Sequence, residues 1–149
     1  MDAPALTDDP RQILAGVPDP EAQRMLTAIW EIIQTWDDLI DQDKPVPPEA
    51  IHRAFLAALE LPANPFYSRF MGQFLPLLQL GFIRWIAANV YERELRSLDK
   101  AYMLRATYYD LVAMVYYCLQ GPAQVETYAP SVYDRYGETL ESLKAEVEL

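Results

Sequence analysis

Apolar residues in the first third of the chain recur with the spacing of an α-helix. At about 100° per residue they fall within an arc of about 120°; these residues are Met25, Ile29, Ile32, Ile33, Trp36, Leu39 and Ile40. Asp19-Pro20-Glu21 precedes them and supplies an N-cap, a proline for the first helical position and an acid for the first turn. Lys44-Pro45 is a stop, because a residue before proline avoids the helical region. The pattern predicts one long helix between these signals.

Further helices are predicted along the rest of the chain. A second helix restarts at Pro47 or Pro48 and carries an apolar side made of Ile51, Phe55, Leu56 and Leu59. A short segment over about 65–71 is capped by Asn64, and a helix over about 73–95 is apolar nearly all round, which is typical of the middle of a bundle. A helix over about 99–119 ends at Gly121-Pro122.

The end of the chain reads as one or two short amphipathic helices over 130–148, around Gly137. Their apolar residues are expected to dock on the bundle: Val132, Tyr136, Leu140, Leu143 and Val147. No segment alternates with period two for long. We therefore predict an all-α fold, a compact bundle of about six helices with no sheet, in one domain over 19–149 after a flexible arm over 1–18.

Composition narrows the class of protein. The chain has 149 residues, 52% of them hydrophobic, and one cysteine, which favours one globular domain in a reducing compartment. Its 12 basic residues are scattered and outnumbered by 22 acidic ones, which disfavours nucleic acid and anionic membranes as partners. The acidic first residues do not resemble a secretory signal, and Arg84 and Asp110 interrupt the longest apolar runs, so we expect a cytoplasmic protein.

Three aspartates end the first long helix on the side opposite its apolar arc. Asp37 and Asp41 are four residues apart and Asp38 and Asp41 three apart, so the three share a face. Their mutual repulsion and the helix dipole disfavour this arrangement, and Lys44 and Arg53 are expected to offset part of the cost. Three interpretations follow: a solvated helix face, a protein-contact site, or a Mg²⁺ or phosphate site, since carboxylate oxygens are hard ligands.

The run "DDLID", residues 37–41, resembles the DDxxD motif of isoprenoid-diphosphate synthases and class I terpene synthases. That resemblance implies an all-α bundle in which Asp37, Asp38 and Asp41 bind a Mg²⁺-diphosphate. It covers five residues, and no second motif of that family is present.

Longer stretches, "WDDLIDQDKPVP", "ELPANPFY" and "LRATYYDLV", are similar to small all-helical proteins of tailed bacteriophages and prophages. This resemblance implies a phage-associated origin and no established activity.

Polar residues within the apolar helices are further candidates for a ligand site. Asp110 lies on an apolar face, where a carboxylate must be paired or protonated. It is expected to pair with an arginine such as Arg84 or Arg105, or with a tyrosine hydroxyl; the alternative is that it acts as a catalytic acid. Asn89 and Glu92 share a face with apolar neighbours, where they either line a polar pocket or cap the core. The single histidine, His52, and the single cysteine support neither a zinc site nor a catalytic dyad.

Two functions are compatible with these features. The first is a non-enzymatic protein that binds another protein or itself, because catalytic motifs are missing and tyrosines are abundant. The second is a minimal Mg²⁺-dependent diphosphate-binding protein built on Asp37, Asp38 and Asp41, with Arg53 or Arg105 nearby.

Overall fold

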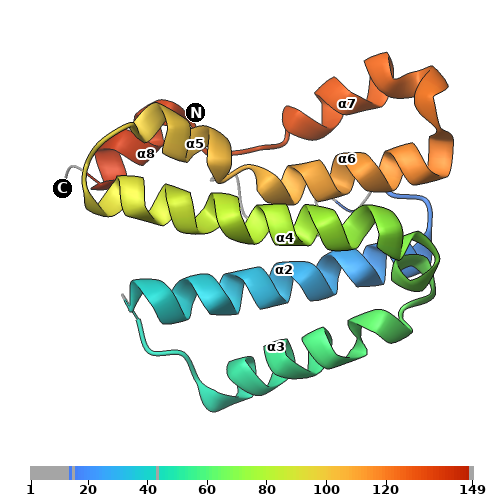
Figure 1. Ribbon diagram of the computed structural model, residues 1–149, viewed down its shortest axis with the longest axis horizontal. Helices are drawn as coiled ribbons and strands as arrows, with labels where there is room; N and C mark the ends of the chain where they lie inside the picture. The colour runs from blue at the N-terminus through green and yellow to red at the C-terminus, as the bar shows by residue number, and fades with distance from the viewer. Residues whose placement is uncertain (1–13, 15, 43, 148–149) are drawn as a thin grey trace. The chain divides into compact units, whose positions relative to one another are not determined.

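The computed structural model describes residue 14, residues 16–42 and residues 44–147, and these residues form helices and no strand (Figure 1). The all-α prediction is confirmed. The α-helices are α2 (Pro20–Asp41), α3 (Pro48–Glu60), α4 (Pro65–Arg93), α5 (Leu98–Leu104), α6 (Thr107–Gln120), α7 (Val125–Tyr133) and α8 (Leu140–Val147). Two short 3-10 helices, η1 (Leu61–Ala63) and η2 (Pro122–Gln124), join α3 to α4 and α6 to α7.

The chain divides into two compact units, and the division falls within α4, between Met71 and Gly72. Next to it, Phe70 leaves the helical region, with φ −113° and ψ 24°. The break predicted between the segments over 65–71 and 73–95 corresponds to this kink. A single cooperative domain over 19–149 stays a prediction.

Helices α2 and α3 form an antiparallel hairpin in the first unit (Figure 1). The predicted cap of α2 is confirmed, because Asp19 Oδ1 accepts the N–H of Ala22 at 2.9 Å and Pro20 follows it. The helix ends earlier than Lys44-Pro45 predicted. Gln42 already adopts the left-handed conformation, with φ 56°, and donates its N–H to the carbonyl of Asp38.

The predicted cap of α4 is also confirmed and ties that helix to α2. Asn64 Oδ1 accepts the N–H of Tyr67 at 2.9 Å, and its amide donates to the carbonyl of Glu21 at 3.0 Å. Buried side chains surround this junction: Leu14, Val17, Ala22, Met25, Leu26, Ile29, Phe66 and Tyr67. The predicted arm over 1–18 lies mostly outside the described residues; Leu14 and Val17, which belong to it, are buried rather than loose.

In the second unit, α4 and α6 approach closely at Gly81. A Cβ at this glycine would lie 2.6 Å from Cγ2 of Thr107. The helix predicted over about 99–119 is broken before Thr107, whose hydroxyl donates to the carbonyl of Leu104 at 3.0 Å.

The last helices pack onto this unit as predicted, although the predicted start of the first of them was wrong. Helix α7 begins at Val125 and contains Pro130, the residue at which the sequence predicted a start. Its Val132 is buried, and Leu143 of α8 is buried against Ala88 and Ala101. The C-terminal segment is therefore part of the core.

Candidate functional site

The aspartates that suggested a metal site lie at the C-terminal end of α2. Asp41 is exposed, whereas Asp37 and Asp38 are half-buried. Lys44 Nζ lies 3.6 Å from Oδ2 of Asp38, so part of the predicted compensation is present.

A metal-binding arrangement of these carboxylates is not evident in the fold. Among the residues that the structure describes, no three His, Cys, Asp or Glu side chains come close enough to hold one ion. The Mg²⁺ interpretation of Asp37, Asp38 and Asp41 stays a prediction without geometric support.

Asp110, on α6, is half-buried and has two partners. Arg84 Nη1 donates to its Oδ2 at 2.9 Å, and the hydroxyl of Tyr133 donates to its Oδ1 at 2.5 Å. Burial and then the bond to Asp110 raise the pKa of Tyr133. The arginine and tyrosine partners match the structural interpretation of Asp110, and the carboxylate joins α4, α6 and α7.

Arg105 and Glu92, two predicted ligand-binding residues, bind each other. Nη1 of Arg105 donates to Oε1 of Glu92 at 2.7 Å, and its Nε lies 3.4 Å from Oε2 of Glu138. Tyr136 donates to the same Glu138 oxygen at 3.0 Å and also reaches the carbonyl of Tyr102. These contacts link α4, the end of α5 and the segment between α7 and α8.

Burial and the neighbouring charges shift the pKa values of this cluster in opposing directions. Burial alone would lower the pKa of Arg105, but Glu138 and Glu92 reverse this and raise it. Burial raises the pKa of Glu138, while Arg105 and Tyr136 oppose that change. Because the guanidinium of Arg105 already has two carboxylates, we interpret this cluster as structural. The sequence predicted Tyr136 only as an apolar residue that docks on the bundle and did not predict Glu138 as a partner of Arg105, because segments far apart in the chain bring these side chains together.

The remaining predicted ligand residues, Asn89 and Arg53, lie on different helices. Asn89 is half-buried on α4, one turn before Glu92. Arg53 is exposed on α3 and lines a groove between α2 and α3.

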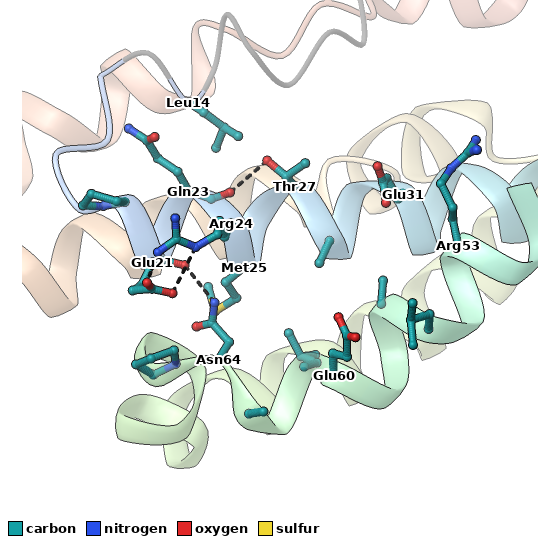
Figure 2. Close-up of a pocket in the computed structure, with 17 residues that line it drawn as sticks. Leu14, Glu21, Gln23, Arg24, Met25, Thr27, Glu31, Arg53, Glu60 and Asn64 are labelled. Carbon is teal, nitrogen blue, oxygen red and sulfur yellow. Dashed lines mark hydrogen bonds and ion pairs between the residues drawn. The ribbon is translucent and has the colours of Figure 1, made fainter.

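This groove encloses about 1020 Å³ and is bounded by both helices of the hairpin (Figure 2). Glu31 and Arg53 lie toward one end, and Glu21, Arg24 and Asn64 toward the other. Arg24 pairs with Glu21, and the side chain of Asn64 makes two hydrogen bonds to the backbone. The groove brings together no nucleophile with a base that would indicate chemistry.

The outer face of α3 is the most unusual surface of the hairpin. No residue of α3 is buried. Its small residues Ala50, Ala54 and Ala57 are half-buried, while its large apolar side chains stand in solvent: Ile51 (38% exposed), Phe55 (66%), Leu56 (52%) and Leu59 (63%). We call these four residues the α3 face. The sequence predicted this apolar side of α3. It did not predict that the alanines would be less exposed than the large apolar side chains.

Helix α4 exposes apolar side chains as well, among them Leu75, Phe82, Ile83 and Ile86. It is the one helix in the described part of the chain that is long and apolar enough to cross a membrane. Its most apolar window has a mean hydropathy of 1.2, and 17% of that window is buried. Length and composition alone support this finding, and Arg84 within the helix is paired with Asp110. Cytoplasmic localisation stays a prediction.

No protein-family model, curated protein or solved structure matches the chain. The resemblances to bacteriophage proteins and to the DDxxD motif therefore remain predictions from the sequence.

Proposed function

We propose that this chain acts by binding another protein, and that the α3 face is its contact surface. One observation carries the proposal: every large apolar residue of α3 is exposed, although the helix is well formed. Exposed apolar side chains gathered in one patch mark interaction sites, because burying them against a partner removes apolar area from water.

The composition of the α3 face suits this role. Phenylalanine is enriched in interface cores, which are also depleted of charge. On α3 the charged residues Glu49, Arg53 and Glu60 lie about 120–160° away from Phe55 around the helix. A partner centred on the row Ile51, Phe55 and Leu59 therefore buries no charge of α3, whereas Leu56 has Arg53 and Glu60 as helical neighbours.

Site-specific photo-crosslinking tests the proposal in the organism that encodes the chain. A photoreactive amino acid replaces Phe55 in one variant and Glu126, an exposed residue of α7, in a matched control. A discrete covalent adduct with another protein is expected from position 55 and not from position 126. Equal adduct patterns at both positions, or no adduct at 55, would contradict the proposal.

A further inference from the structure

The hairpin that carries the α3 face is acidic, and its charge is concentrated beside one end of that face. Over residues 20–64 the sequence has eight acidic and three basic residues, a net charge of −5. Asp37, Asp38 and Asp41 lie at the end of α2, and Glu49 lies in the first turn of α3. Because only residues 42–47 connect the helices, these acids flank the end of the α3 face at which Ile51 lies.

The basic residues of the hairpin do not cancel this charge at the α3 face. Arg24 pairs with Glu21, and Lys44 lies beside Asp38. Arg53 lines the groove toward α2, as Leu56 does, and lies away from the row Ile51, Phe55 and Leu59 around the helix. A partner would therefore contact an apolar row with acidic residues at one end.

We propose that the α3 face binds an amphipathic helix of another protein that carries Lys or Arg beside its apolar anchors. Apolar anchors at helical spacing fit a row such as Ile51, Phe55 and Leu59, which recur every four residues. Basic residues on the partner complement the acidic end, which speeds encounter and sets orientation. This inference rests on the proposed function and names the chemistry of the partner.

A second copy of the chain and an anionic membrane are less suitable occupants. Each copy carries a net charge of −10, and symmetric contact would place acidic hairpins side by side. Anionic lipid meets the same repulsion. The charge that disfavours these two occupants favours a basic one.

Two designed peptides of about five helical turns test the inference. Both carry Leu and Phe at positions i, i+3, i+4 and i+7, and they differ only in having Lys or Glu at the other positions. Fluorescence anisotropy with the full chain is expected to show binding of the Lys peptide, roughly tenfold weaker when salt rises from about 0.01 to 0.15 M, and at least tenfold weaker binding of the Glu peptide.

Matched variants distinguish specific binding at the α3 face from nonspecific hydrophobic or electrostatic binding. Phe55→Ser is expected to weaken binding of the Lys peptide at least tenfold, whereas Phe82→Ser, at another exposed phenylalanine on α4, leaves it unchanged. Asp41→Asn with Glu49→Gln is expected to weaken it several-fold at low salt only. The same pair of changes at Glu126 and Asp134, both exposed in or beside α7, is the charge control.

Other outcomes overturn the inference in distinguishable ways. Equal affinity for both peptides, or binding that survives Phe55→Ser, contradicts it. Self-association of the wild type that Phe55→Ser abolishes assigns the α3 face to a second copy. A crosslinked protein partner at position 55, together with no binding of either peptide, leaves the proposed function standing and rejects the basic helix.

Discussion

Arg105 is a charged side chain that connects separate segments of this helical fold. Its guanidinium is mostly covered and binds Glu92 of α4 and Glu138 in the segment between α7 and α8. Such a cation holds the position of carboxylates that would otherwise be buried without a partner. The polar residues that looked like ligand candidates in the sequence are, in this cluster, the connections between helices.

Replacing Arg105 by alanine is expected to lower the free energy of unfolding by about 2 kcal/mol, because two half-buried carboxylates lose their cation. Urea unfolding measures the change. The control is Arg96→Ala, which breaks an exposed pair with Glu94 and a cation–π contact with Tyr91 and is expected to cost about 1 kcal/mol or less. Equal effects of the two substitutions would contradict a structural role for Arg105.

Glu138 gives this cluster a dependence on pH. Because burial raises its pKa in the folded state, the folded protein keeps the proton at a higher pH than the unfolded chain does. The stabilisation is complete below the ordinary value of 4.5 and is lost as pH rises through the raised pKa. The unfolding free energy of the wild type minus that of Glu138→Gln should therefore fall as pH rises above 4.5. Urea titrations in steps of about half a pH unit measure it, and a difference that rises would refute the assignment.

The aspartates of α2 allow a test of the alternative function at the same scale. Calorimetric titration of Mg²⁺, with and without pyrophosphate, is expected to give no saturable heat at millimolar metal, since Asp38 already faces Lys44. Saturable binding that disappears in Asp37→Asn/Asp41→Asn would instead make these residues a metal site.

At the scale of elements, most helices were predictable from local signals. Asp19-Pro20 and Asn64 marked helix starts correctly because caps act over three or four residues. The break between α5 and α6 was not predictable, since alanine and threonine at 106–107 carry no stop signal; the bond of Thr107 to Leu104 accompanies it. A tyrosine hydroxyl was predicted as a partner of Asp110, but neither Tyr133 nor Glu138 could be identified as a partner in advance, because no local pattern encodes contacts between distant segments of the chain.

Two glycines in α4 predict opposite effects of the same substitution. A Cβ at Gly72 meets nothing within 4 Å, so Gly72→Ala is expected to stabilise the protein by about 0.5–1 kcal/mol through the unfolded state. A Cβ at Gly81 meets Thr107, so Gly81→Ala is expected to destabilise by about 1–3 kcal/mol. Thermal unfolding of both variants checks the signs. A stabilising Gly81→Ala would mean that α4 and α6 do not approach as described.

Tryptophan fluorescence can test whether the two units of the chain unfold together. Trp30 and Trp36 lie before the division at Met71, and Trp85 lies after it. We expect a single cooperative transition, as is usual for chains of this size. Variants that keep Trp85 alone, or Trp30 and Trp36 alone, should then show the same urea midpoint by fluorescence. Distinct midpoints would show that the units are separate domains.

On α3 the half-buried alanines and the large apolar side chains lie on different sides of the helix, and this arrangement affects how easily the helix opens locally. Small side chains bring few atoms into contact, so α3 has little packing energy to lose when it separates locally from α2. Its amide protons should therefore exchange with deuterium faster than those around Met25 and Ile29, which are buried. A partner that covers the helix would slow this exchange, so the uptake of deuterium by α3 reports occupancy of the surface even before the partner has a name.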